Sequence, residues 1–288
     1  MSIRNNEDRL GAKAPGESPP IPQTQQETPS AASSVFSFAV PTEVVDLPSG
    51  GQFYPEGHPL RGVDTVEIKH MTAKEEDILT SRSLLKKGLA IDRLLQSIMV
   101  DKRISPDDLL IGDKNALLIM TRIVGYGSDY ETNITCPTCM TTSKNSFNLS
   151  KLEAAGVDLE GEQDIARKGD HFLITLPKTK VEVEVRLLYG RDEKFLAEAT
   201  SLKRKNNLPD TALTDQIRLF TVSVNGHTDK QSINNFINNV PASDSRALRR
   251  AYEKVVPNVD MTQNFICNSC DYEADMEVPL SADFFWPK

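Results

Sequence analysis

The chain has 288 residues, of which 39% are hydrophobic and 26% charged, so it can form about two domains with ordinary hydrophobic cores. Its formal net charge of -8 argues against a general nucleic-acid binder, because such a protein needs Lys and Arg clustered toward phosphates. No stretch reaches the roughly 18 apolar residues that span a membrane, and the N-terminus lacks the apolar core of a secretory signal, so we expect synthesis in a reducing cytoplasm.

Residues 1–34 are rich in Pro, Ser, Gln and Glu and contain few large apolar side chains. Such a segment cannot bury enough surface to offset its ordering entropy, so we predict a disordered N-terminal arm. Order is expected to begin at the alternating run Val35–Phe38. The following segment, Leu47–Pro55, is dense in turn formers and carries two aromatic residues. It is predicted to lie extended over another surface, and we favour the chain's own helices as that surface.

Residues 35–128 are predicted to combine this extended segment with a small helical unit. The helix signals, in chain order, are a capping box of Thr72 and Glu75, an apolar face of Ile91, Leu94, Leu95 and Ile98, the turn formers and acids of Ser105–Asp108, and Asp113, expected to cap a helix that runs to Val124. Gly125 and Gly127 are expected to stop that last helix.

The hydrophobic period changes in residues 151–257, which we predict to be an inserted α+β subdomain. Alternating apolar residues over Phe172–Leu176 and Val181–Val185, with a turn between them, indicate a β-hairpin. A helix is expected over Asp192–Lys205, with Phe195, Leu196, Ala199 and Leu202 on one side. A further helix is expected from Ser243 to Val255, where Pro257 ends it.

The strongest motif is a pair of CxxC knuckles, formed by Cys136 with Cys139 and by Cys267 with Cys270. The two-residue spacer lets the chain turn tightly, so that both sulfurs of a knuckle can approach one metal ion. Four thiolates fill a tetrahedral coordination sphere and leave no position for water. The motif therefore predicts one structural Zn²⁺ ion on these four ligands and no catalytic metal.

The residues around the two knuckles repeat as well. Apolar side chains lie two residues before each knuckle and eight and ten residues after it: Ile134, Phe147 and Leu149 in the first copy, and Phe265, Val278 and Leu280 in the second. Each copy is thus predicted to be strand, knuckle, strand. Two such hairpins sharing one ion form a zinc ribbon, here split into residues 129–150 and 258–288 by the insert.

Three other interpretations of the cysteines are weaker. Redox CxxC pairs usually lie at a helix start beside a βαβ unit, and neither pair is predicted to do so. Two separate ions would need further ligands, yet the four histidines, His58, His70, His171 and His227, are scattered. Idle reduced cysteines would not explain the matched flanking residues.

Other features have less specific interpretations. The basic run Lys203–Lys205 is better explained as a solvated helix end than as a phosphate-binding face. Arg246, Arg249 and Arg250, at helical spacing, are better explained as a helix surface than as a site that pairs with an acidic partner or with nearby Asp and Glu. The aromatic run Phe284–Trp286 is expected either to fold back on the ribbon or to anchor in a neighbour. No catalytic or nucleotide-binding motif is present, so we expect no enzyme.

Several of these features together carry a resemblance to a known family. They are Leu47–Pro55, the first knuckle with Phe147 and Leu149, Pro241–Leu248, Asn258–Asp260, the second knuckle and Phe284–Trp286. In this order and spacing, over about residues 40 to 288, the chain resembles the T-even-type bacteriophage baseplate family, which includes baseplate hub subunits and hub-assembly catalysts.

The resemblance implies a structural or assembly protein of the central hub of a contractile tail, present in the virion and, during assembly, in the host cytoplasm. Implied partners are hub proteins and the tape-measure protein, without nucleic acid or membrane, and the oligomeric state would be set by the assembly. The alternative is a nucleic-acid-associated zinc-ribbon factor. It predicts a basic stripe, whereas Asp271, Glu273, Asp275 and Glu277 make the second hairpin acidic.

Overall fold

The computed structural model describes residues 39–279 and 282–285. Helices and strands alternate through the described part, which confirms the α+β class. The predicted arm of residues 1–34 and the run Val35–Phe38 lie outside the described residues, and the predicted domain boundaries stay predictions. Within the described part, no helix has both the length and the hydropathy to cross a bilayer.

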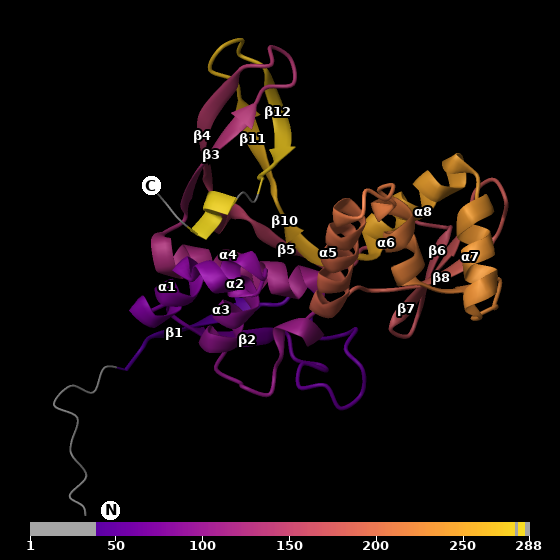
Figure 1. The fold of residues 1–288 in the computed structure, drawn as a ribbon, viewed down its shortest axis with the longest axis horizontal. Coiled ribbons are helices and arrows are strands. Elements are labelled where there is room, and N and C mark those ends of the chain that lie inside the picture. The colour runs from indigo at the N-terminus through magenta and orange to yellow at the C-terminus, as the bar shows by residue number, and fades with distance from the viewer. Residues whose placement is uncertain (1–38, 280–281, 286–288) are drawn as a thin grey trace, which may run out of the picture. The chain divides into compact units, whose positions relative to one another are not determined.

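The first part of the chain forms a hairpin and a set of short helices, as Figure 1 shows in indigo and purple. Strands β1 (Thr42–Asp46) and β2 (Thr65–Lys69) pair antiparallel. The helical elements are α1 (Ala73–Thr80), α2 (Arg82–Lys86), α3 (Ala90–Ile98), the 3-10 turn η2 (Pro106–Asp108) and α4 (Ile111–Tyr126). Ser105 therefore precedes a single 3-10 turn and not a longer helix.

Two of the predicted helix signals are confirmed. At the start of α1, the Glu75 carboxylate accepts hydrogen bonds from the Thr72 backbone N–H at 3.0 Å and from its hydroxyl at 2.5 Å, as a capping box requires. In α3, the apolar face is buried through Leu94, Leu95 and Ile98. Local sequence was sufficient to predict both features because each pattern is contained within a few residues.

Asp113 does not cap α4, which corrects the prediction made from its sequence position. It lies in the first turn of the helix, fully buried, and its carboxylate bonds the turn-rich segment instead. It accepts hydrogen bonds from the Ser49 N–H at 3.0 Å, from the Ser49 hydroxyl at 2.6 Å and from the Tyr54 hydroxyl at 2.6 Å. The segment Leu47–Pro55 is thus held on the chain's own helix, as predicted.

Helix α4 also contacts the chain just before β10, where it returns from the middle of the sequence. A Cβ atom on Gly112 would lie 1.8 Å from the carbonyl oxygen of Pro257, so only glycine allows this approach. Pro257 leads directly into β10 (Asn258–Asp260), which pairs antiparallel with β5 (Glu153–Ala155). Strand β5 follows the hairpin that carries the first two cysteines, and β10 precedes the hairpin that carries the other two. Their pairing therefore joins the segment that leaves the first hairpin to the segment that enters the second.

The middle of the chain folds around a four-stranded antiparallel sheet in the order β6-β7-β8-β9. Its elements are β6 (Ile165–Lys168), β7 (His171–Thr175), β8 (Glu182–Arg186), α5 (Gly190–Lys205), α6 (Ala212–Phe220), β9 (Thr221–Val224), α7 (Lys230–Asn239) and α8 (Ala242–Val255). The predicted hairpin and the helices α5 and α8 are confirmed, whereas α6, β9 and α7 were not predicted. The sheet buries Phe172, Val183 and Val185.

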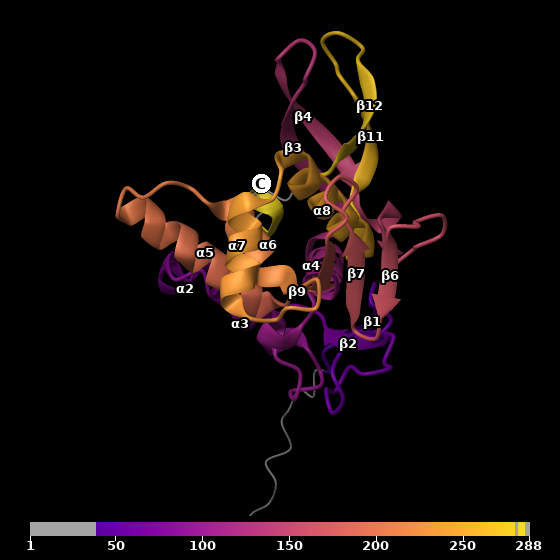
Figure 2. The same ribbon diagram turned by 90° about the vertical axis from the view of Figure 1, so that its right-hand side faces the viewer.

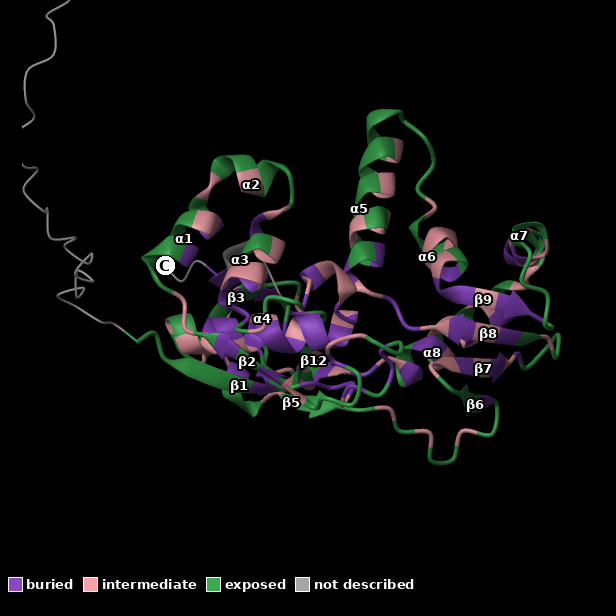
Figure 3. Cartoon of the chain, turned by 90° about the horizontal axis from the view of Figure 1, so that it is seen from below, coloured by how far each residue is buried: buried purple, intermediate pink, exposed green. Residues whose placement is uncertain are grey.

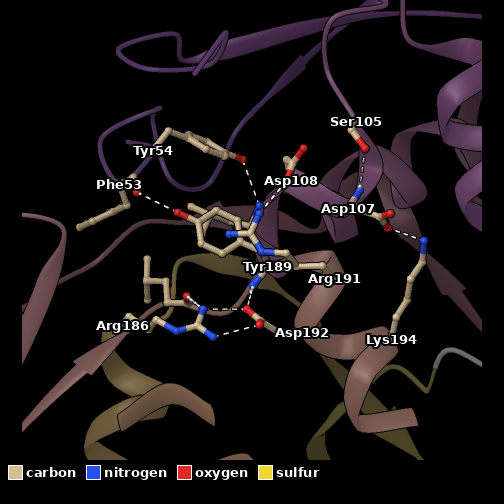
Figure 4. Close-up of polar contacts among 12 residues, drawn as sticks. Phe53, Tyr54, Ser105, Asp107, Asp108, Arg186, Tyr189, Arg191, Asp192 and Lys194 are labelled. Atoms are coloured by element: carbon tan, nitrogen blue, oxygen red, sulfur yellow. Dashed lines mark hydrogen bonds and ion pairs between the residues drawn. The ribbon is translucent and has the colours of Figure 1, made fainter. Parts of the chain in front are cut away.

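The first turn of α5 is tied to the elements before it by ion pairs (Figure 4). Asp192 receives a bidentate pair from Arg186, at 2.7 and 2.9 Å, and a hydrogen bond from the Tyr189 N–H at 2.9 Å. Arg191 pairs with Asp108 of η2 at 2.6 Å. Burial alone would raise the pKa of Asp192, but the Arg186 guanidinium and the Tyr189 N–H outweigh it and hold the pKa below its ordinary value.

Replacing Asp192 by asparagine is therefore expected to destabilise the protein by about 2 kcal/mol at pH 7, since it leaves Arg186 without its charged partner. A lowered native pKa means that the unfolded chain binds the proton more tightly, so this contribution is present at neutral pH and lost as the pH falls below about 4. Urea unfolding of wild type and Asp192→Asn at several pH values measures it. A difference that stays constant between pH 7 and pH 3 would contradict the assignment.

Candidate metal centre

The four cysteines lie in the turns of two β-hairpins. The first hairpin consists of β3 (Asp129–Thr135) and β4 (Thr142–Asn148), followed by the turn η3 (Leu149–Lys151), and the second consists of β11 (Thr262–Ile266) and β12 (Glu273–Glu277). Both views of the ribbon show the hairpins side by side with their turns at the same end (Figures 1 and 2).

The two turns repeat the same backbone hydrogen bonds. The N–H of Cys136 bonds the carbonyl of Thr141 at 3.0 Å, and the N–H of Cys267 bonds that of Tyr272 at 2.9 Å. The residue after each second cysteine donates back to the carbonyl of the first cysteine, at 3.0 Å in both copies, and has a positive φ: 58° at Met140 and 53° at Asp271. The internal repeat predicted from the flanking residues therefore extends to the backbone of the turns.

The four sulfur atoms converge on one point. The Sγ atoms of Cys136 and Cys270 are 3.8 Å apart, those of Cys139 and Cys267 are 3.7 Å apart, and all four lie within 4.8 Å of one another. A disulfide would require about 2.0 Å between sulfurs. A tetrahedron of sulfurs about 2.3 Å from a central Zn²⁺ has edges of about 3.8 Å, so the arrangement fits one ion with four thiolate ligands.

The surrounding groups shift the pKa values of Cys139 and Cys270 in opposite directions. Hydrogen bonds from Thr141 lower the pKa of Cys139 to about 6. The Tyr272 N–H by itself would lower the pKa of Cys270, but burial and the three neighbouring thiols raise it to about 12. Four adjacent thiolates repel one another, so a divalent cation is the group that would allow all four to be deprotonated together.

The hairpins bury a common apolar layer beneath the cysteines. Ile134 and Phe147 of the first hairpin and Phe265 and Val278 of the second are each at most 5% exposed, whereas Leu280 lies outside the described residues. Asn148 and Gln263 join the hairpins through two hydrogen bonds, at 3.2 and 2.7 Å. The cysteine cluster is thus supported by packing and hydrogen bonds between segments more than 100 residues apart in the sequence.

A buried arginine holds the base of the first hairpin, and no sequence signal pointed to it. Arg122 of α4 is 2% exposed and donates hydrogen bonds to three backbone carbonyls: to Phe284 at 2.7 Å, to Gly127 at 2.6 Å and to Asp129 at 3.1 Å. Phe284 and Phe285 belong to the turn η4 (Ala282–Phe285) and are buried, and the Phe284 ring lies 5.2 Å from that of Tyr130. These two aromatic residues therefore fold back on the chain, and Trp286 lies outside the described residues.

The histidines take no part in the cysteine cluster. His58 stacks on Tyr54, His70 lies 3.9 Å from Glu43, His171 lies 3.1 Å from Glu184, and His227 is exposed in the turn after β9. The knuckles also lie in hairpin turns and not at helix starts, where redox CxxC pairs are usual. The donor set is therefore four sulfurs, which is typical of a structural zinc site.

The model of the T4 bacteriophage base plate protein family matches residues 40–286. The chain belongs to this family. Family membership implies a location in the phage tail and contacts with other baseplate proteins. Searches of curated proteins and of solved structures find no match to this baseplate protein.

Proposed function

We propose that this baseplate protein is a structural and assembly component of the central hub, that it docks hub proteins and the tape-measure protein, and that Cys136, Cys139, Cys267 and Cys270 bind one structural Zn²⁺ ion. The single observation that carries the zinc proposal is the convergence of four sulfurs from two hairpins at tetrahedral spacing. A closed Cys₄ sphere has no position for substrate or water, which agrees with a protein that is not an enzyme.

The ion would act as a clasp between distant parts of the chain. The first knuckle lies near the middle of the sequence and the second near its end, with 127 residues between Cys139 and Cys267. Bound metal stabilises only the state in which both knuckles meet, so its binding free energy adds to that of folding. In the proposed function, the clasp keeps the paired hairpins in one conformation for contact with neighbouring subunits.

The nucleic-acid alternative fits the second hairpin poorly. Residues 256–279 contain no Lys or Arg, and the side chains of Asp271, Glu273, Asp275 and Glu277 are exposed. A duplex or single strand would be repelled by such a surface, because its affinity comes largely from neutralising phosphates. A protein-docking role does not need a basic face.

Isolation of complexes tests the proposed role. Tagged protein expressed during infection is expected to co-purify with the tape-measure and hub proteins, and an untagged chain to sediment with assembled baseplates or their hub intermediates. Recovery with baseplate subunits of the periphery, and not with hub or tape-measure proteins, would contradict the hub assignment while leaving the family assignment intact.

A further inference from the structure

Helix α5 is a long element that the described residues of the chain cover only at its start. It has 16 residues, yet only Gly190 and Asp192, both in its first turn, are buried. Figure 3 shows the helix in the exposed and intermediate colours over most of its length. Because most of a helix's stability in a protein comes from the packing of its apolar face, the later turns of α5 are expected to pack against a partner.

On the apolar side predicted for α5, the described part of the chain leaves two large side chains exposed. Phe195 is 60% exposed and Leu202 is 58% exposed, two turns apart on the helix. Leu208 in the following loop and Leu213 at the start of α6 are each 57% exposed. Single exposed apolar residues are ordinary on a protein surface, but a row of them along one helix and its loop is typical of an interaction site.

A groove beside this row can receive side chains of a partner. It has a volume of about 590 Å³ and lies between α5, α6 and α7, with Phe195 and Ala199 from α5, Leu219 from α6 and Ile233 from α7 contributing apolar walls. A groove between helices with an adjoining apolar row matches the way an amphipathic helix is bound, with anchors at three- and four-residue spacing.

The rim of the groove is positively charged although the chain as a whole carries -8. Lys203, Arg218 and Lys230 line it together with a single carboxylate, Asp215, which pairs with Lys203 and with Arg218. Arg204, exposed beside Lys203, and the neighbouring Lys205 extend the positive charge at the end of α5. A ligand that covers this surface would gain from acidic residues next to its apolar face.

We propose that the α5 groove, the hollow between α5, α6 and α7, binds an amphipathic helix of another baseplate protein. The apolar side chains of that helix enter the groove, and its acidic residues face the cations at the rim. This inference rests on the proposed function, since it supplies one docking surface for it. A second copy of this chain is a poorer occupant, because two α5 helices placed face to face would oppose like charges. The acidic β11–β12 hairpin of a second copy lacks a helical apolar row.

A photocrosslinker placed at position 202 of the full-length chain during infection tests the proposal. The expected product is a crosslink, mapped by mass spectrometry, to a segment of a different tail protein with apolar residues at helical spacing and flanking Asp or Glu. A crosslink only to another copy of this chain, to a segment without acidic residues, or to no protein in assembled tails would overturn the inference. Sedimentation of the chain with tails, scored in the same sample, reports separately on the proposed function.

Substitutions make the test quantitative. The double variant Phe195→Ser/Leu202→Ser is expected to lower the crosslink yield from a probe at position 208 about 10-fold or more, because the removed side chains are the apolar contacts. Arg204→Glu/Lys205→Glu is expected to lower it as well and to weaken its salt dependence. Leu85→Ser, at a 45% exposed leucine of α2, is the matched control and should leave the yield unchanged. Equal losses in the control and the α5 variants, or no loss in the α5 variants, would contradict the assigned surface.

Discussion

Replacing Cys267 by serine is expected to remove zinc from the purified protein and to unfold the paired hairpins. A serine hydroxyl is a poor zinc ligand, and the remaining three sulfurs cannot close the tetrahedron. Structural zinc sites contribute about 10 kcal/mol or more of binding free energy in model peptides, so losing the ion removes most of what holds hairpins that bury only a thin apolar layer. Metal analysis is expected to fall from about one zinc per chain to nearly none.

The loss should be local. Hydrogen exchange is expected to accelerate in β3, β4, β11 and β12, whereas β7 and β8, which belong to a different sheet, keep their protection. His227→Ala serves as the control, since this exposed histidine lies outside the cysteine cluster and its loss should leave zinc content unchanged. A Cys267→Ser protein that retains one zinc per chain would refute the four-sulfur site.

Replacing Asp113 by alanine is expected to destabilise the protein by about 3 kcal/mol, the largest effect we expect outside the cysteines. The change leaves two donors of Ser49 and the Tyr54 hydroxyl buried without their acceptor. Burial raises the pKa of Asp113 against the hydrogen bonds that would lower it, so part of the gain from these bonds is already offset by the cost of burying the carboxylate. Urea unfolding of the two proteins at pH 7 measures the difference.

Two further variants separate this network from a general effect of losing an acid. Asp77→Ala, at an exposed aspartate of α1, should change the unfolding free energy by less than about 0.5 kcal/mol. Tyr54→Phe removes one of the three hydrogen bonds to Asp113 and also the acceptor of the Leu110 N–H. Combined with Asp113→Ala it should show non-additive losses, because both changes act on one network. Additive losses would mean that the hydrogen bond from Tyr54 to Asp113 contributes little.

The parts of the fold that could be predicted from sequence are those set by short-range patterns. The hairpin of β7 and β8 follows from period-two alternation, and α3 follows from apolar residues at three- and four-residue spacing. The two CxxC turns share residue types, spacing and flanking apolar positions, so their convergence could be inferred although they lie far apart in sequence. Each of these patterns carries its own physical cause within a few residues.

The errors occurred where a distant segment decides the role of a residue. Asp113 stands where a cap is common, yet its partners come from residues 49 and 54, and local propensity cannot weigh a contact of that kind. The spacing along α5 predicts one apolar side but not what covers it, and no described segment of the chain covers Phe195 or Leu202. Arg122 gave no signal, because its partners are backbone carbonyls.

The proposed structure of the paired hairpins depends on one zinc ion held by four sulfurs from two distant knuckles. X-ray absorption at the zinc edge of the purified protein tests it. We predict a first shell of four sulfurs at about 2.3 Å with one zinc per chain. A folded protein without metal, or a first shell that contains nitrogen or oxygen in place of any of the four sulfurs, would contradict it.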